Sequence, residues 1–147
     1  MKNHEFQHRS VLPVDPETAF AWHERPGAFE RLSPPWQDVR LIHRKGTIHD
    51  GDESLIQLGV GPIHIDWKAR HRNFQRNKAF EDEQVRGPFA RWRHVHQFDR
   101  ANGASCELTD RIEYALPGGA VGDAVAGAHV QRQLKQMFDY RHRQTRE

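Results

Sequence analysis

Residues 89–117 read FARWRHVHQFDRANGASCELTDRIEYALP, and most of the architecture can be worked out from this stretch. It contains two long alternating segments that meet at a turn. Apolar and ionisable side chains share one face of the first segment, namely Ala90, Trp92, His94, His96 and Phe98. The matching face of the second segment holds Cys106, Leu108, Asp110, Ile112, Tyr114 and Leu116. Because successive side chains of a strand point to opposite sides, the pattern predicts a β-hairpin with one buried face.

The turn Arg100-Ala101-Asn102-Gly103 sets the predicted pairing of the two strands. Gly103 can adopt a positive φ at little cost, and a three-residue loop ending there pairs residues whose numbers add up to 204. This register places His94 opposite Asp110 on the buried face. Burying such a pair costs free energy unless both partners are satisfied, so we expect the two side chains to be in contact.

Three interpretations of His94 and Asp110 remain open. The pair can be purely structural, fixing the strand register, or it can contact the polar part of a ligand. It can also be catalytic, with His94 moving a proton while Asp110 tunes its pKa. The sequence does not choose between them.

Two other chemistries are not expected on this hairpin. His94, His96 and Asp110 have the residue types of a two-histidine, one-carboxylate metal site. In the predicted register, however, His96 faces Leu108 and no fourth ligand is evident, so we expect no metal. Cys106 lies opposite an aromatic residue rather than a base, which favours an inert buried thiol over a nucleophile.

Length and composition limit the class of protein. The 147 residues fit one domain, 1–147, and the apolar residues are periodic although hydrophobic content is only 36% and charged content is 29%. We expect a soluble cytoplasmic domain without a signal peptide or transmembrane segment. Its single cysteine excludes an intramolecular disulfide. Because the net charge is only +2 and charges of both signs are interleaved, we do not expect nucleic-acid binding.

The N-terminal half of the chain predicts one strand, two short helices and a series of antiparallel strands. Residues 4–12 alternate as a strand does. Asp15 and Pro16 are typical of a helix start, and Pro26 ends this helix and opens a second short one that runs through Leu32. From Val39 onward, Gly, Asn, Asp and Pro separate short alternating segments.

The C-terminal part predicts a long helix from Val121 to about Arg141, because its apolar residues recur at helical spacing. Its first half offers mainly small side chains such as Ala124 and Ala128. We therefore expect a cavity of roughly 300–1,000 Å³ beneath the first half. The basic residues near the end are expected on a solvated face; they are Arg132, Lys135, Arg141, Arg143 and Arg146.

Four motifs carry a resemblance to a known superfamily. They are Phe80-x-Asp82-x-Gln84-x-x-Gly87-Pro88-Phe89, Trp92-x-His94-x-His96-x-Phe98, Asp110-x-Ile112-x-Tyr114-x-x-Pro117 and Phe138-x-Tyr140-Arg141-His142. Together with the order of elements, they resemble the SRPBCC or START-like superfamily, in its branch of polyketide cyclases, dehydrases and coenzyme Q-binding-like proteins. The pattern is also similar to the domain fused ahead of an NAD-dependent epimerase in some bacterial proteins. No Rossmann-type glycine motif follows it here, so we do not expect the activity of that fused partner.

The resemblance implies an α+β helix-grip fold, in which a curved antiparallel sheet of about seven strands wraps a long C-terminal helix. It also implies that a small hydrophobic molecule, such as a lipid, isoprenoid or polyketide-like compound, is bound or carried without a cofactor. The alternatives are a cyclase or dehydratase using His94 and Asp110, and a protein-interaction module, and a homodimer is possible. The expected ligand-binding residues are Trp67, Gln84, Trp92, His94, His96, Tyr114, Ala124 and Ala128.

Overall fold

The computed structural model describes residues 3–25, 28–36, 39–60 and 62–146. In chain order the elements are β1 (His4–Leu12), α1 (Pro16–His23), α2 (Ala28–Leu32), β2 (Val39–Lys45), β3 (Glu53–Val60), β4 (Ile63–Gln75), β5 (Ala79–Arg86), β6 (Arg91–Arg100), β7 (Cys106–Ala115) and α3 (Gly119–Arg146). This is the predicted order. Pro26, the predicted start of the second short helix, lies outside the described residues.

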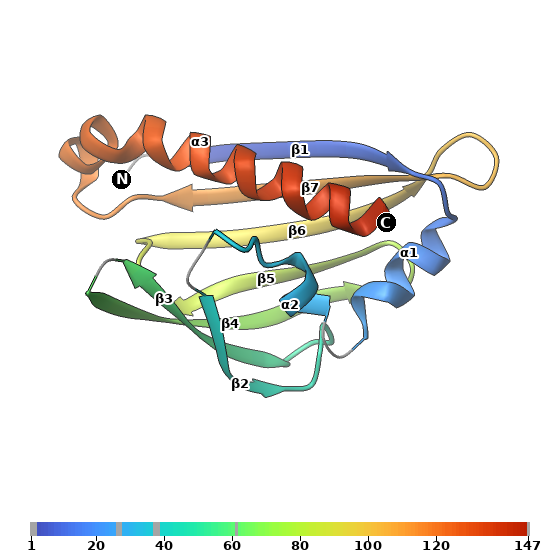
Figure 1. Cartoon of the computed structure of the whole chain (residues 1–147), viewed down its shortest axis with the longest axis horizontal. Helices are drawn as coiled ribbons and strands as arrows, with labels where there is room; N and C mark the ends of the chain where they lie inside the picture. The colour runs from blue at the N-terminus through green and yellow to red at the C-terminus, as the bar shows by residue number, and fades with distance from the viewer. Residues whose placement is uncertain (1–2, 26–27, 37–38, 61, 147) are drawn as a thin grey trace.

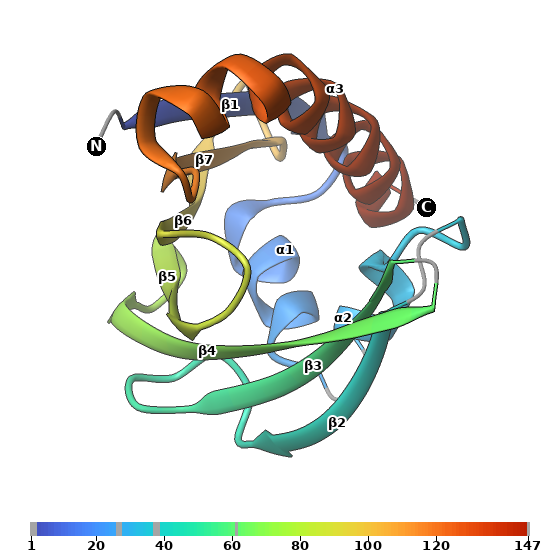
Figure 2. The same cartoon turned by 90° about the vertical axis from the view of Figure 1, so that its left-hand side faces the viewer.

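The seven strands form one antiparallel sheet in the order β1-β7-β6-β5-β4-β3-β2. Seen from the end, the sheet curls from β1 and β7 around to β2 and β3, and α1, α2 and α3 lie on its concave side (Figure 2). The long helix α3 runs along β1 and β7 across the open side of the curl (Figure 1). The predicted helix-grip fold is therefore confirmed.

The start of α1 follows the predicted chemistry. The Asp15 carboxylate accepts a hydrogen bond from the backbone N–H of Thr18 at 2.7 Å, and Pro16 occupies the first turn. This cap holds α1 against the open end of the sheet, where Phe20 is fully buried against Phe98.

The register of the β6–β7 hairpin differs from the prediction by two residues. Asp110 pairs with His96, and His94 pairs with Ile112. The reason lies in the loop, which spans residues 101–105 and closes with a hydrogen bond from the Ala101 N–H to the Ser105 carbonyl. Gly103 has the expected positive φ of 63°, but the loop is longer than three residues. A shift of two residues leaves every side chain on its predicted face.

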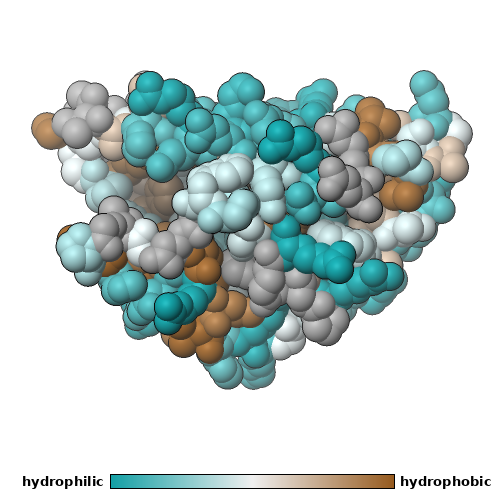
Figure 3. All heavy atoms as spheres, in the orientation of Figure 1, coloured by the Kyte–Doolittle hydropathy of each residue, from teal (hydrophilic) through white to brown (hydrophobic). Residues whose placement is uncertain are grey.

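The second half of α3 is anchored in the core. Leu134 is 5% exposed and Phe138 is fully buried, and both pack with Phe6, Trp92 and Tyr114. On the face of the molecule shown in Figure 3, the solvent side of α3 is mostly hydrophilic. Hydrophobic side chains gather on another part of this face, over β2 and its neighbours. Within the described residues, no helix has the length and apolar character needed to cross a membrane.

Candidate functional site

A pocket of about 600 Å³ lies between the concave side of the sheet and the second half of α3. Its volume is within the range of small-molecule sites. Alternate residues of β3 and β4 and the core side of β6 and α3 form its apolar walls, which include Ile56, Leu58, Ile65, Trp67, Trp92 and Met137. The Trp67 and Trp92 rings meet edge to face with their centroids 4.9 Å apart.

Ionisable side chains also line this pocket, in contrast to its apolar walls. They come from α1, four strands and α3, and they are His23, Arg44, His71, Asp82, His94, His96 and Arg141. For the residues on strands, the two-residue period explains the placement, since it puts Asp82 of β5 and both histidines of β6 on the concave face.

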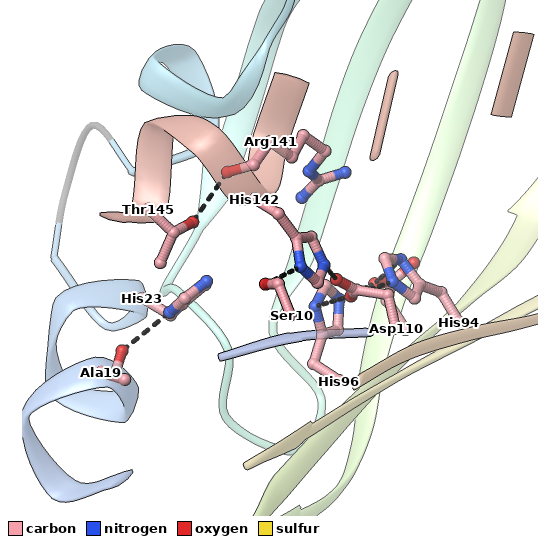
Figure 4. A network of polar contacts seen from close by, with 10 residues as sticks. Ser10, Ala19, His23, His94, His96, Asp110, Arg141, His142 and Thr145 are labelled. Carbon is pink, nitrogen blue, oxygen red and sulfur yellow. Dashed lines mark hydrogen bonds and ion pairs between the residues drawn. The ribbon is translucent and has the colours of Figure 1, made fainter. Parts of the chain in front are cut away.

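Asp110, on β7 behind the two β6 histidines, accepts hydrogen bonds from three histidine rings (Figure 4). Its Oδ1 atom lies 2.7 Å from His94 Nε2 and 3.0 Å from His96 Nδ1. Its Oδ2 atom lies 2.5 Å from His142 Nε2 of α3. His142 in turn is hydrogen-bonded through Nδ1 to the hydroxyl of Ser10 on β1. The predicted contact between His94 and Asp110 therefore exists, although it is diagonal rather than directly cross-strand.

Asp82 faces the opposite edges of the same two histidine rings. Its Oδ2 atom lies 3.2 Å from His96 Nε2 and 3.7 Å from His94 Nδ1. The His94 and His96 rings are 3.7 Å apart between centroids, so they sit side by side between two carboxylates. Each histidine turns one nitrogen to Asp110 and the other toward Asp82 and the pocket.

The histidines keep both aspartates ionised in spite of burial. Burial by itself raises the pKa of each carboxyl group, but the hydrogen bonds from His142, His94 and His96 lower the pKa of Asp110 well below its usual value. The pKa of Asp82 is likewise lowered by His96 and His94 against the effect of burial.

The two β6 histidines are shifted in opposite directions. Burial and the neighbouring charge of His96 lower the pKa of His94 to about 4, so His94 is neutral at pH 7. Burial opposes a charge on His96 too, but its hydrogen bonds to Asp110 and Asp82 prevail and raise its pKa. Of these two histidines, a proton therefore binds more readily to His96 than to His94.

Arg141 does not lie on a solvated face, as the sequence suggested, but lines the pocket. The guanidinium sits over the Phe138 ring, 5.1 Å from its centroid, and burial lowers its pKa. In the part of the chain that the structure describes, its N–H groups form no ion pair or hydrogen bond. Figure 4 shows the guanidinium projecting from α3 above the histidine cluster. The helical spacing predicts the helix, but it does not indicate which side of the basic helix end faces a cavity.

Residues 12–139 match the family model described as polyketide cyclase / dehydrase and lipid transport. The chain belongs to this family. No curated protein sequence shows significant similarity to it.

Solved structures show the same fold over nearly the whole chain. The nucleoside-diphosphate sugar epimerase from Corynebacterium glutamicum has a TM-score of 0.74 and 26% identity, with 96% of this chain and 28% of that chain covered. Norcoclaurine synthase from Thalictrum flavum has a TM-score of 0.72 and 12% identity, with coverages of 95% and 84%. A START superfamily protein from Mycobacterium smegmatis has a TM-score of 0.71 and 9% identity, with coverages of 97% and 94%. The predicted SRPBCC or START-like membership is confirmed.

Half of the ligand-binding residues predicted from the sequence line the pocket, namely Trp67, Trp92, His94 and His96. Gln84 instead binds the backbone of Phe89 through both its amide atoms. Tyr114 is fully buried and accepts a hydrogen bond from Gln131. Ala128 is exposed on α3, and the side chain of Ala124 lies outside the described part. The pocket lies under the second half of α3 because Val130, Leu134 and Met137 face the sheet across a gap that they do not fill.

Several residues of the site were not predicted from the sequence, among them Asp82, Arg141 and His142. Asp82 and His142 occur in the quoted family motifs, and Asp82 alternates with Phe80 on the buried face, which is a signal that could have been used. Arg141 was predicted to lie on a solvated helix face, whereas it lines the pocket. In each case the missing information is which elements become neighbours in space.

Proposed function

We propose that this family member binds a small amphipathic molecule in the pocket between the sheet and α3. The apolar walls would enclose its hydrophobic body, and the ionisable groups would hold a polar end. The observation that carries the proposal is one space of about 600 Å³ with tryptophans along its wall and the Arg141 guanidinium among its lining residues.

Arg141 indicates the chemistry of the polar end. A desolvated guanidinium is costly unless it is paired. Within the described residues the Arg141 guanidinium contacts the Phe138 ring and is attracted by the charges of Asp110 and Asp82, but it forms no hydrogen bond or ion pair. A ligand carboxylate, phosphate or carbonyl oxygen would supply the missing hydrogen-bond acceptor. The ligand is therefore proposed to be a lipid-like, isoprenoid or polyketide-like compound with an acidic or carbonyl group.

The test is to purify the protein gently, extract it with organic solvent and identify the co-purified molecule by mass spectrometry. The same molecule is then titrated into delipidated protein, with tryptophan fluorescence as the readout. Ala69→Phe places a large side chain in the pocket, whereas His64→Phe places the same side chain on the exposed face of β4. We expect binding to be lost in Ala69→Phe alone. Equal binding by both variants would place the ligand elsewhere.

A second candidate is an enzyme of the cyclase or dehydratase type. His94 lines the pocket and is neutral, so its Nδ1 atom can accept a proton from a bound carbonyl compound. Asp110 does not line the pocket and would act through His94, by orienting the ring. Conversion of the extracted compound by fresh protein, abolished in His94→Gln, would favour the enzyme, whereas recovery of the compound unchanged would favour the carrier.

A further inference from the structure

Three metal-ligand atoms converge on one point at the edge of the pocket. Asp82, His94 and His96 each offer one ligand atom, and these three atoms lie within 4.8 Å of one another. The carboxylate oxygen is 3.7 Å from His94 Nδ1 and 3.2 Å from His96 Nε2. Ligand atoms bound at about 2.1 Å to one ion are about 3.0 Å apart at octahedral angles and about 3.4 Å apart at tetrahedral angles. Small side-chain rotations are therefore enough to place all three on one ion.

Asp110 orients both histidines for this role. Because its carboxylate accepts hydrogen bonds from His94 Nε2 at 2.7 Å and from His96 Nδ1 at 3.0 Å, the protons sit on those nitrogens. The lone pair of His94 is then on Nδ1, and His96 can offer Nε2. A carboxylate behind each metal-binding histidine is the usual outer-shell arrangement of metal sites. His142 holds the Asp110 carboxylate in place from α3.

The charges of the cluster also favour a cation. The buried carboxylate of Asp110 and the partly exposed carboxylate of Asp82 face each other across the two histidine rings, and Arg141 forms an ion pair with neither of them in the described part of the chain. In the metal-free protein a hydrogen bond joins His96 Nε2 to Asp82 Oδ2. A bound ion would take the place of the proton in this hydrogen bond. At 3.7 Å, His94 Nδ1 is too far from Asp82 for a hydrogen bond, so this nitrogen is available to an ion.

We propose that Asp82, His94 and His96 form a binding site for a divalent transition-metal ion, with its remaining coordination positions open to the hydrophobic pocket. All three side chains line the pocket, so an ion held between them would border the space that the ligand is proposed to fill. Two imidazoles with one carboxylate suit Fe²⁺, Zn²⁺ and similar ions better than Mg²⁺ or Ca²⁺, which prefer all-oxygen sites. The inference goes beyond ligand binding, because an ion held there would coordinate an oxygen of the bound molecule.

The test uses Zn²⁺ alone, added to protein stripped with a chelator, and isothermal titration calorimetry. We expect one Zn²⁺ per chain, bound at least about 100-fold more weakly by Asp82→Asn and by His96→Gln, because even outer-shell changes cost about 10–100-fold. His49→Gln is the matched control. His49 also contacts two carboxylates, Glu24 at 3.0 Å and Asp52 at 3.6 Å, but its side chain is 46% exposed. Unchanged affinity in Asp82→Asn, or loss in His49→Gln, would overturn the proposal.

A measurement on the wild-type protein guards against variants that fail to fold. Mn²⁺ broadens NMR signals of nearby nuclei, so sub-stoichiometric Mn²⁺ should broaden the ring signals of His94 and His96 first. Broadening of the exposed His43 and His64 rings with His94 and His96 unaffected would overturn the site. Neither measurement involves an organic ligand, so failure here leaves the proposed ligand binding to its own test.

Discussion

His142, near the end of α3, lies 2.5 Å from the carboxylate of Asp110 in the middle of β7. This contact joins the last helix of the chain to the centre of the sheet. Both side chains are buried, with 1% and 4% exposure, and the same carboxylate also holds His94 and His96. One aspartate therefore links the position of α3 to the orientation of the pocket histidines.

The first prediction concerns this aspartate. Asp110→Asn removes the negative charge that helps to raise the pKa of His96, and it replaces one acceptor oxygen by a donor NH₂ group. We expect the free energy of unfolding to fall by about 3–5 kcal/mol in a denaturant titration at pH 7. Asp139→Asn is the control: Asp139 also connects α3 to a histidine of β1, His8 at 2.7 Å, but its side chain is 42% exposed. A loss under about 1 kcal/mol is expected there, and equal losses would show that burial does not set the difference.

The second prediction concerns the pH dependence of stability through His23 of α1. His23 is 5% exposed, and burial lowers its pKa to about 4. The unfolded chain takes up this proton below about pH 6.5 and the folded chain only near pH 4, so stability falls as the pH falls through this window. Between pH 7.5 and pH 5, His23 should account for about 2 kcal/mol of that loss.

The check on His23 compares wild type with His23→Leu by urea titration at both pH values. His94, His96, Asp110 and Arg141 remain in both proteins, so their contributions largely cancel in the difference. The variant should lose less stability than wild type on going to pH 5. An identical loss in both proteins would show that His23 is not held neutral in the fold.

The third prediction concerns the thiol of Cys106. It is fully buried, and burial raises its pKa to about 11, so almost no thiolate exists at pH 8. A thiol reagent such as dithionitrobenzoate should label the unfolded chain quickly and the native chain only at the rate of unfolding. Rapid labelling of native protein would contradict the inert role.

The fourth prediction tests how α3 is anchored. Phe138 is fully buried in the cluster that contains Phe6 and Trp92, so Phe138→Ala should lower the free energy of unfolding by about 3–5 kcal/mol. Val121→Ala truncates a side chain on the same helix that is 73% exposed, and it should cost less than about 0.5 kcal/mol. A small loss in Phe138→Ala would mean that α3 docks differently.

The fifth prediction separates anionic from neutral ligands. Arg141→Met keeps an unbranched apolar side chain but removes the guanidinium. It should weaken binding of a fatty-acid probe by about 10- to 100-fold, because a hydrogen bond to a charged group contributes about 1.5–3 kcal/mol. Binding of the corresponding fatty alcohol should change little. Arg143→Met, at an exposed position of the same helix, should bind both probes as wild type does.

The alternation of side chains in strands and their spacing in helices were sufficient to predict the secondary-structure elements, their order and the faces that they bury. The β6 and β7 patterns placed His94, His96 and Asp110 on one buried face, and this holds because side-chain direction in a strand has a period of two. The hairpin register was wrong by two residues, since a glycine with positive φ is compatible with loops of three or five residues. The error left the faces unchanged but concealed that His96, rather than His94, lies opposite Asp110.

The pocket chemistry depends on which strands and helices become neighbours. Asp82 approaches His96 only because β5 pairs with β6 in one register, and His142 reaches Asp110 across 32 residues of chain. Arg141 faces the pocket because the curl of the sheet leaves a gap under the second half of α3. Local periodicity reports which way a side chain points relative to its own strand or helix. It gives no information about the distance to a partner far along the chain. That distance is set when the sheet curves around α3.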